Sequence, residues 1–470
     1  MRKTKIICTI GPAVSTEEKL IKLIECGMNC ARFNFSHGTH ESQKAMMDLF
    51  KSARKKTGTN IPMLLDTKGP EIRVKNFKDG SIMLQDGQHF VLDDKEEDGD
   101  VNRIGLTYGK LGEALKKGDR ILIDDGKLDL EVEEIKGHEV KCLVKHGGKL
   151  SNHKSINVPN VSIPMPFLSE TDKSDILFGI SQDVDFIAAS FTRTEQDIRE
   201  LRDFLDANGG KNIEVIAKIE NTEGVENFEK ILKIANGIMV ARGDLGVEIH
   251  FKDIPTIQKR IIDKCNQYGK LAVVATQMLE SMTSNPRPTR AEVSDVANAV
   301  FDGATCIMLS GESANGMFPF EAVTTMASIA ESAEESIYSS TKAHREYTLD
   351  DDITQIVCKA AYEAAEYAHA KAIIALSTSG NTARRISLYK PTVPVIAFVA
   401  EEKGCRQLSL YYDVYPNKVE KKNTPDEVIQ LGKTKIRELN LVAKGDKVVL
   451  ISGTNFSHGH TDSVLLYQID

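Results

Sequence analysis

The stretch IEVIAKI, residues 213–219, is a short, almost continuous apolar run that contains Lys218 and is followed directly by Glu220. Similar runs recur along the chain, each followed by a polar loop and a helical pattern. They are TKIICTI (4–10), NCARFNF (29–35), IPMLLD (61–66), VDFIAAS (184–190), GIMVA (237–241), LAVVAT (271–276) and TCIMLS (305–310). Continuously apolar strands are typical of a parallel sheet covered on both faces. The alternation of strands and helices therefore predicts an α/β fold, a (β/α)8 TIM barrel, with a doubly wound open sheet as the alternative.

Helix-start signals support this alternation. Ser15 and Glu18 have the spacing of a capping box, with Gly27 as the stop of the helix that follows. Thr289 and Glu292 have the same spacing before AEVSDVANAVFDGA. Both patterns predict helices between consecutive barrel strands.

The segment between Asp66 and Val184 is far too long for a βα loop. Inside it the apolar residues recur at every second position, which is typical of antiparallel strands. These residues are Ile121, Ile123, Leu128, Leu130, Val132, Val140, Cys142 and Val144. Turn signals at Asp125-Gly126 and Lys136-Gly137 separate the runs. We therefore predict a small β-barrel lid domain over residues 70–166, placed over the face of the barrel where active sites lie.

A second α/β pattern begins after the polar linker SSTKAHREYTLDDD (339–352). The pattern predicts helices over 353–369 and near 424–439, with strands AIIALST (372–378), VPVIAFV (393–399), VVLIS (448–452) and VLLYQI (464–469). The predicted division of the chain is a barrel over 1–69 and 167–340, the lid over 70–166, and a separate C-terminal α/β domain over 341–470.

Composition limits the classes of function. The 470 residues carry 60 basic and 68 acidic side chains, a net charge of −8, which argues against a nucleic-acid partner. Apolar runs fall short of the ~20 residues that a membrane span needs, and the start of the chain is unlike a secretory signal. The 8 cysteines form no CxxC pair, so neither a zinc site nor a disulfide framework is indicated. We expect a cytoplasmic protein with no membrane partner.

Polar residues follow nearly every predicted barrel strand, at the end where barrel enzymes place their chemistry. The strand ends read Arg32-Phe-Asn34-Phe-Ser36-His37, Asp66-Thr67-Lys68, Lys218-Ile-Glu220, Arg242-Gly243-Asp244, Thr276-Gln277 and Ser310-Gly311-Glu312. Residues two apart share one face of a strand, so charged pairs such as Lys218 and Glu220 point inward together.

These residue types indicate a site that binds an anionic substrate together with metal cations. Glu220 and Asp244 could place two hard oxygens on one Mg²⁺ or Mn²⁺, and Arg32 and Lys218 could balance a phosphate or carboxylate. Glycine at 243 would let backbone N–H groups approach an anion closely. A weakly charged oxygen set at Asn34, Ser36, Asp66 and Thr67 suits a monovalent cation. The alternative interpretation is that these charges only stabilise the fold, as structural ion pairs of Lys218 with Glu220 and of Arg242 with Asp244.

The sequence resembles the pyruvate kinase family along essentially its whole length. The matching segments are KIICTIGPA, ARFNFSHGTHE, LLDTKGPEIR, DFIAASFTR, IAKIEN, GIMVARGDLGVEI, VATQMLESM and PRPTRAEVSDVANAV, in family order. The resemblance implies a barrel with an inserted lid and a C-terminal regulatory domain, usually assembled as a homotetramer. It also implies phosphoryl transfer from phosphoenolpyruvate to ADP, the last step of glycolysis.

Carried over by position, the resemblance assigns Arg32 and Lys218 to the transferring phosphoryl group and Glu220 and Asp244 to Mg²⁺ (or Mn²⁺). It assigns Asn34, Ser36, Asp66 and Thr67 to K⁺. Gly243, Asp244 and Thr276 would bind the substrate carboxylate. Pro12, Asn34, His37 and Arg73 would contact the nucleotide. Thr276, Ser310 and an ordered water all stay open as donors of the enolate proton.

The chain departs from the family pattern in Ser169-Glu-Thr171-Asp172, where Thr171 replaces the usual nucleotide-binding lysine. Lys173 lies nearby, and the nucleotide preference stays open. Glu71 stands where glutamate in this family accompanies a requirement for K⁺.

The turn Ser377-Thr378-Ser379-Gly380-Asn381-Thr382 leads from a strand into a helix and predicts a phosphate cradle for an allosteric effector. A capped turn without ligand is the alternative. The resemblance adds the loop Gly453–Thr461 as the second half of the pocket. Thr454 and Asn455 replace the Trp and Arg of fructose 1,6-bisphosphate sites in animal members, so a monophosphate is at least as well suited.

Two other functions stay open from the residues alone. A metal-dependent barrel lyase or aldolase acting on a 2-oxo acid would use Glu220 and Asp244 without a nucleotide. A non-catalytic sugar-phosphate sensor is disfavoured because Arg32, Lys218, Glu220 and Asp244 are all present.

Overall fold

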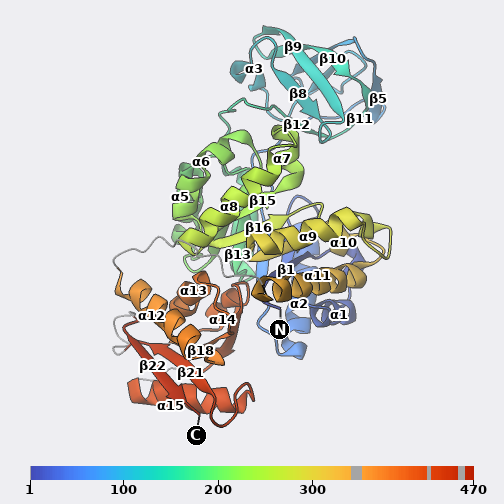
Figure 1. The fold of residues 1–470 in the computed structure, drawn as a ribbon. Helices are drawn as coiled ribbons and strands as arrows, with labels where there is room; N and C mark the ends of the chain where they lie inside the picture. The colour runs from blue at the N-terminus through green and yellow to red at the C-terminus, as the bar shows by residue number, and fades with distance from the viewer. Residues whose placement is uncertain (1, 340–351, 421–424, 454–460, 470) are drawn as a thin grey trace.

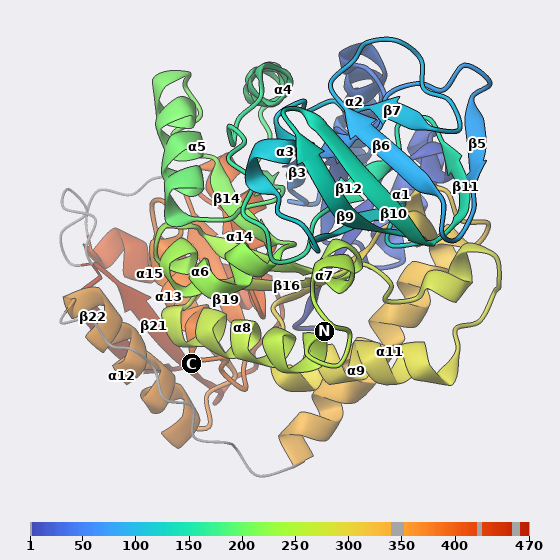
Figure 2. The same ribbon diagram turned by 90° about the horizontal axis from the view of Figure 1, so that it is seen from above.

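The computed structural model describes residues 2–339, 352–420, 425–453 and 461–469. Figure 1 shows the barrel in the middle, the small β domain standing off one end and the C-terminal domain lying toward the other end. In the view from above, the β domain covers one side of the barrel opening (Figure 2).

Eight parallel strands form a closed barrel in the order β1-β17-β16-β15-β14-β13-β3-β2. The strands are β1 (Lys5–Thr9), β2 (Cys30–Asn34), β3 (Met63–Asp66), β13 (Phe186–Ala189), β14 (Glu214–Ile219), β15 (Gly237–Ala241), β16 (Leu271–Ala275) and β17 (Cys306–Leu309). They coincide with the eight predicted apolar runs. The prediction of a barrel is confirmed, and the open sheet is excluded.

Helices alternate with these strands on the outside of the barrel (Figure 2). They are α1 (Glu17–Glu25), α2 (His40–Thr57), α4 (Glu170–Ser181), α5 (Glu195–Ala207), α6 (Thr222–Ile234), α7 (Arg242–Glu248), α8 (Ile254–Tyr268), α9 (Arg290–Asp302), α10 (Gly311–Ala314) and α11 (Pro319–Ser339). The capping box of Thr289 and Glu292 is present at the start of α9. The box predicted at Ser15 and Glu18 is wrong, because Thr16 is the N-cap of α1 and accepts a hydrogen bond from the Lys19 backbone N–H.

Along each barrel strand, side chains point alternately into the inside of the barrel and toward the helices that surround it. On β14, Val215, Ala217 and Ile219 pack between the barrel and its helices, whereas Ile216 belongs to the core inside the barrel. Since strand side chains alternate, Lys218 also faces the inside, one step further toward the lid end. The lower barrel is filled by apolar side chains, and polar side chains form its last inner layer.

The inserted domain is a small β barrel that is antiparallel except for the parallel pair β6 and β7. One sheet has the order β4-β12-β8-β9-β10-β6-β7, and β11 pairs separately with β5. The elements are β4 (Ile72–Arg73), β5 (Ser81–Leu84), β6 (His89–Asp93), β7 (Arg103–Gly105), α3 (Leu111–Ala114), β8 (Arg120–Ile123), β9 (Leu128–Lys136), β10 (Glu139–His146), β11 (Gly148–Ser151) and β12 (Ser155–Asn157). A bridge between Val74 and Leu106 joins the two outer strands and closes the sheet.

The C-terminal domain is a five-stranded sheet in the order β20-β19-β18-β21-β22, parallel except for the antiparallel edge strand β22. Its elements are α12 (Ile353–Tyr367), β18 (Ala372–Ser377), α13 (Asn381–Leu388), β19 (Val395–Val399), α14 (Glu402–Leu408), β20 (Val414–Lys418), α15 (Pro425–Glu438), β21 (Lys447–Ser452) and β22 (Ser463–Gln468). Sequence analysis missed β20, whose residues VYPNK are mostly polar. The predicted linker lies almost wholly outside the described residues.

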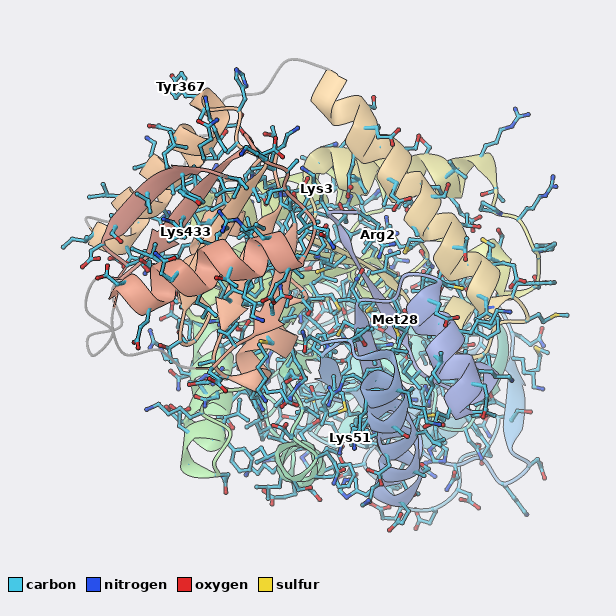
Figure 3. The ribbon with its side chains drawn as sticks, turned by 90° about the horizontal axis from the view of Figure 1, so that it is seen from below. Arg2, Lys3, Met28, Lys51, Tyr367 and Lys433 are labelled. Atoms are coloured by element: carbon cyan, nitrogen blue, oxygen red, sulfur yellow. The ribbon has the colours of Figure 1, made fainter. Side chains whose placement is uncertain are left out.

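The C-terminal domain closes the lower end of the barrel. Its apolar side chains share one continuous core with the inner residues of the barrel strands. Hydrogen bonds reach the first residues of these strands: the Lys5 ammonium donates to the Val414 carbonyl, and the Tyr411 hydroxyl donates to Glu214 at 2.8 Å. Figure 3 shows Arg2 and Lys3 near this junction, where Lys3 pairs with Asp413 at 3.1 Å.

Arg406 of α14 makes a buried polar bridge in this junction. Its guanidinium contacts Asp185, just before β13, at 2.8 Å and Asp183 at 2.6 Å. Both Arg406 and Asp185 are buried, and Met63 N–H also donates to Asp185. Burial raises the pKa of Asp185, and Arg406 opposes that rise.

We predict that Arg406→Met destabilises the protein, because Asp185 loses the charge that compensates its burial. The expected fall in the free energy of unfolding is about 3–5 kcal/mol. Lys403→Met is the matched control: Lys403 pairs with the exposed Asp183, so its loss should cost less than about 1 kcal/mol. Urea unfolding followed by circular dichroism measures both, and equal midpoints for the two variants would contradict the prediction.

Candidate active site

Lys218 lies at the lid end of β14, inside the barrel, between two carboxylates. Its ammonium nitrogen is 3.1 Å from Asp66 Oδ1 and 3.0 Å from Glu220 Oε1, and it donates to the Ser190 hydroxyl at 2.8 Å. Burial disfavours the charged amine, but Asp66 and Glu220 outweigh it and raise the pKa of Lys218 above its usual value. The ammonium is therefore permanently charged and held by three partners on three neighbouring strands or their ends.

Arg32 enters the same layer from β2. Its Nε is 2.6 Å from Asp66 Oδ2, and its Nη1 donates to the Thr9 hydroxyl at 2.7 Å. Burial alone would raise the pKa of Asp66, yet Lys218 and Arg32 hold it below the usual value. Asp66 thus joins both cations into one network at the barrel mouth.

Glu220 and Asp244 form a pair of carboxyl groups beside this network, and each contributes to the shifted pKa of the other. Glu220 is buried and accepts from Phe191 N–H at 2.6 Å. Burial raises the pKa of Glu220 to about 7; Lys218 opposes the rise and Asp244 adds to it. Burial also raises the pKa of Asp244. The two carboxylates share a single cation, Lys218, so they keep a net negative charge that a divalent cation can neutralise.

Thr276 lies after β16 with a φ of +66°, which β-branched residues rarely adopt, and Gln277 follows at +54°. The Thr276 hydroxyl donates to the Ala275 carbonyl and accepts from Gly243 N–H at 2.8 Å. Arg242 holds this turn by donating to the Thr276 carbonyl at 2.7 Å, and its ion pair is with Asp295. The alternative pairing of Arg242 with Asp244 is therefore wrong.

The predicted monovalent-cation oxygens come together at the ends of β2 and β3. Asn34 and Asp66 are direct neighbours in the strand register. Asn34 Oδ1 accepts from Ser36 N–H at 3.0 Å. The Thr67 hydroxyl is turned to the next strand, where it donates to the Ala188 carbonyl and accepts from Ser190 N–H. The group offers many oxygens but a single carboxylate, and that carboxylate already has two cationic partners.

The predicted nucleotide contacts lie around the barrel mouth. Pro12 and His37 are exposed beyond β1 and β2, and Arg73 belongs to β4 of the lid. Arg73 pairs with Glu71 at 2.8 Å and donates to the His153 carbonyl. Thr171 is exposed in the first turn of α4, whereas Lys173 pairs with Glu170 at 2.8 Å.

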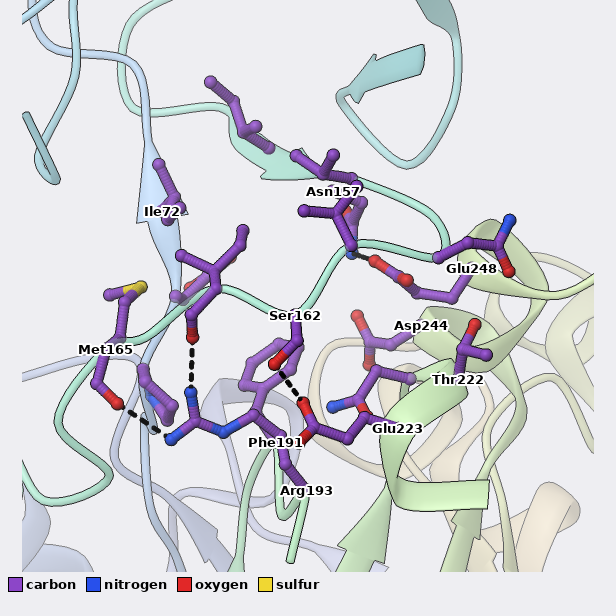
Figure 4. Close-up of a pocket in the computed structure, with 18 of the residues that line it drawn as sticks. Ile72, Asn157, Ser162, Met165, Phe191, Arg193, Thr222, Glu223, Asp244 and Glu248 are labelled. Carbon is purple, nitrogen blue, oxygen red and sulfur yellow. Dashed lines mark hydrogen bonds between the residues drawn. The ribbon is translucent and has the colours of Figure 1, made fainter. Parts of the chain in front are cut away.

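A cavity of about 380 Å³ opens between the lid connections and the barrel (Figure 4). Asp244 and Glu248 line it from α7, and Asn157 of the returning lid strand donates to Glu248 at 3.2 Å. Arg193, which follows β13, donates to the carbonyls of Ile163 and Met165 at 2.8 Å each. The connection that carries the lid is therefore fixed to the strand-end loops that carry the site.

The other residues predicted for function lie at the barrel mouth and in the C-terminal domain. Ser310 follows β17 at the barrel mouth, where its N–H donates to Glu312. The turn 377–382 lies in the C-terminal domain, remote from these residues in the chain and in the fold. Thr382 is buried there, and its hydroxyl is 2.7 Å from that of Thr461. Residues 454–460, which include Thr454 and Asn455, lie outside the described residues.

Ser190 is the site residue that sequence analysis did not single out. Its hydroxyl lies 3.0 Å from Asp66 Oδ1 and 2.6 Å from the Thr67 carbonyl, and it accepts from Lys218. The sequence did hold a signal for this residue: Ser190 is the last residue of the apolar run VDFIAAS, just as the other site residues follow the ends of their strands.

The fold and this site define an α/β-barrel enzyme with a lid, in which buried cations and carboxylates meet at the carboxyl ends of the strands. Family models match twice: "Pyruvate kinase, barrel domain" over residues 1–323 and "Pyruvate kinase, alpha/beta domain" over residues 355–466. The chain belongs to the pyruvate kinase family.

Individual relatives agree with this assignment. A pyruvate kinase of Clostridium acetobutylicum is 45% identical over 100% of both chains, and one of Geobacillus stearothermophilus is 44% identical over 100% of this chain and 80% of its own length. A solved pyruvate kinase from Cryptosporidium parvum superimposes with a TM-score of 0.93 at 37% identity, covering 100% of this chain and 96% of its own. None of the helices in the described ranges combines the length and apolar character needed to cross a membrane.

We predict that Ser190→Ala lowers the turnover of pyruvate formation about tenfold, because Lys218 loses a neutral partner that sets its orientation. The KM for phosphoenolpyruvate should change much less, since orientation matters most in the transition state. Steady-state kinetics measures both constants, with Ser181→Ala on exposed α4 as the control. A turnover within about twofold of the parent would contradict this role.

Proposed function

We propose that this enzyme transfers the phosphoryl group of phosphoenolpyruvate to ADP, giving ATP and pyruvate in the last step of glycolysis. The observation that carries the proposal is the buried ammonium of Lys218, fixed between Asp66 and Glu220 at the mouth of a barrel beneath a lid. Family membership and the residue set at the strand ends support it.

Arg32 and Lys218 are the proposed partners of the transferring phosphoryl group. Both side chains are preorganised by Asp66, so neither has to be reoriented when charge builds up on the phosphoryl oxygens. Such fixed charges act most strongly in the transition state, which makes Lys218 an electrostatic stabiliser and not a proton carrier.

Glu220 and Asp244 would hold Mg²⁺ or Mn²⁺. Their raised pKa values and mutual contact fit that assignment, because a cation supplies the charge that the pair lacks. The described residues contain no cluster of three or more His, Cys, Asp or Glu side chains suited to a metal, which agrees with Mg²⁺ taking one or two protein carboxylates. When bound, the ion would neutralise charge on the enolate oxygen and substrate carboxylate.

The substrate carboxylate is proposed to bind at the start of α7, to the N–H groups of Gly243 and Asp244 and the hydroxyl of Thr276. In the structure Gly243 N–H donates to that hydroxyl, so a ligand would replace an existing hydrogen bond. Thr276, Ser310 and an ordered water are the candidates for donating the proton to the enolate.

Asn34, Ser36, Asp66 and Thr67 would hold K⁺. The proximity of Asn34 and Asp66 on paired strands supports a shared cation, and Glu71 would add negative charge from the lid side. Because the Thr67 hydroxyl bonds the neighbouring strand, its carbonyl is the better-placed oxygen.

ADP is proposed to bind between the barrel mouth and the lid, near Pro12, Asn34, His37 and Arg73. The exposed Thr171 offers no charge there, and Lys173 is engaged with Glu170. Arg73 also has partners, Glu71 and the His153 carbonyl, so we expect the nucleotide phosphates to compete for Arg73 and to be bound by backbone groups as well.

The wider assignments follow from the family. We propose a cytoplasmic homotetramer with a barrel over 1–69 and 167–340, a lid over 70–166 and a regulatory domain over 341–470. Within the latter, the turn Ser377–Thr382 is proposed to bind an effector phosphate. Gly380 makes this turn possible, since its φ is +86° and a Cβ there would meet Leu408 at 2.7 Å.

We predict that Lys218→Met lowers the rate of pyruvate formation by about 10²–10³-fold or more, because one preorganised charge is lost from the transition state. Lys44→Met, which removes an exposed lysine of α2, is the control for charge and expression. The assay is run with ADP, Mg²⁺ and K⁺ withheld in turn. A mutant rate within a few-fold of the parent, or pyruvate formation that needs no ADP, would overturn the proposal.

We also predict that a phosphorylated metabolite lowers the half-saturating concentration of phosphoenolpyruvate through the turn Ser377–Thr382. Ser379→Glu should abolish the shift by repelling the phosphate, whereas Ser181→Glu on α4 should not. Saturation curves are measured with glucose 6-phosphate, ribose 5-phosphate, AMP and fructose 1,6-bisphosphate. Curves that none of the four displaces, or a Ser379→Glu enzyme that still responds, would contradict this site.

A further inference from the structure

A second cavity, of about 530 Å³, lies where the barrel meets the C-terminal domain, at the end of the barrel opposite to the lid. Helices α6 and α8 of the barrel and α12 and α13 of the C-terminal domain surround it, and α13 packs directly against α8 (Figure 1). The cavity therefore spans the junction of two domains, and its size suits a small metabolite.

The lining of this cavity is strongly cationic. Four basic side chains contribute to it, and the lining contains no carboxylate among the described residues. The basic residues are Lys233, Lys270, Arg384 and Arg385. Polar neutral groups complete the wall: Asn236, Tyr268, Gln355 and Asn381. In a protein of net charge −8, this local excess of basic side chains favours a negatively charged ligand.

Two of the four basic side chains already pair with carboxylates that do not line the cavity. Arg384 contacts Glu214 at 2.7 Å, and Arg385 pairs with Asp352. Lys233 and Lys270 have no carboxylate partner in the described part of the chain. The Lys270 ammonium donates to the Ala235 carbonyl at 2.8 Å, and burial lowers its pKa. The carboxylate nearest to Lys270 is Glu214, which already pairs with Arg384, so the four basic side chains of the wall share few negative charges and a dianion would neutralise the excess.

We propose that this cavity binds the dianionic phosphate group of a small phosphomonoester, between Lys233 and Lys270 of the barrel and Arg384 and Arg385 of α13. Arginine forks match phosphate oxygens in geometry, and the amide and phenol groups of the wall offer hydrogen bonds to the remainder of such a ligand. The site is distinct from the turn Ser377–Thr382 and does not depend on the phosphoryl-transfer proposal.

A ligand in this cavity would contact Arg384, which also contacts the catalytic strand β14 and the proposed effector turn. Arg384 contacts Glu214, the first residue of β14, and β14 carries Lys218 at its other end. Arg384 also donates to the Ser379 carbonyl at 3.3 Å, within the proposed effector turn. A phosphate drawn to Arg384 would therefore act on a side chain that joins the regulatory turn to a catalytic strand.

The test uses two dianionic probes on the full-length protein. Crystals are soaked in selenate, whose anomalous scattering locates a phosphate-like ion, and inorganic phosphate is titrated in solution at constant ionic strength while thermal unfolding is recorded. The variants are Lys233→Met, which removes an exposed lysine of the wall, and Ser379→Glu, which changes a side chain of the effector turn and keeps the backbone carbonyl that Arg384 contacts.

We expect an anomalous peak between Lys270 and the two arginines in the parent and in Ser379→Glu. Lys233→Met should weaken phosphate binding about tenfold, since one charge-assisted contact is lost. An empty cavity in a crystal whose other anion sites are filled would overturn the proposal. So would a peak without any solution stabilisation, which would mark binding at crystal concentration only, or undiminished phosphate affinity in Lys233→Met. Because Ser379→Glu tests the effector turn separately, failure of one site is distinguishable from failure of the other.

Discussion

The ammonium of Lys218, held between Asp66 and Glu220, is the interaction on which the rest of the barrel mouth depends. Two cations and three carboxylates are gathered there in a layer that most barrels fill with aliphatic side chains. A buried charge is tolerable only when it is paired and hydrogen-bonded. Asp66 meets that condition for Arg32 and shares it with Glu220 for Lys218, so its loss would leave Arg32 without a carboxylate and Lys218 with Glu220 alone.

The distribution of charge within this layer is uneven, and that unevenness gives the site its chemistry. Asp66 has two cationic partners and a lowered pKa, whereas Glu220 and Asp244 share one and have raised pKa values. The negative excess therefore lies on the side of α7, whereas Arg32 lies on the side of β2 and Lys218, on β14, stands between the two sides. An anion and a divalent cation can enter together and neutralise both sides, whereas either alone would leave an imbalance.

The sequence predicted the features that follow from periodicity and strand position. All eight barrel strands, the β insertion and the inward direction of Lys218 and Glu220 come from spacing alone. What it missed depends on neighbours distant in the chain. Ser190 contacts Asp66 only because β13 lies beside β3. Arg242 forms its ion pair with Asp295 and not with Asp244, because α9 places Asp295 within reach. The left-handed φ of Thr276 opposes the preference of its residue type, so no local rule could have predicted it.

Strand β14 links the two ends of the molecule. Glu214, at its start, is held by Tyr411 and Arg384 of the C-terminal domain, and Lys218 and Glu220 lie at its other end. A β-strand that is hydrogen-bonded on both sides is stiff along its length, so a displacement at Glu214 cannot be absorbed by the few intervening residues. A misplacement of about 1 Å at a catalytic group can cost activity, so a movement of the C-terminal domain that reaches Lys218 through β14 would change the rate. The regulation proposed for the C-terminal domain therefore requires no direct contact between that domain and the substrate.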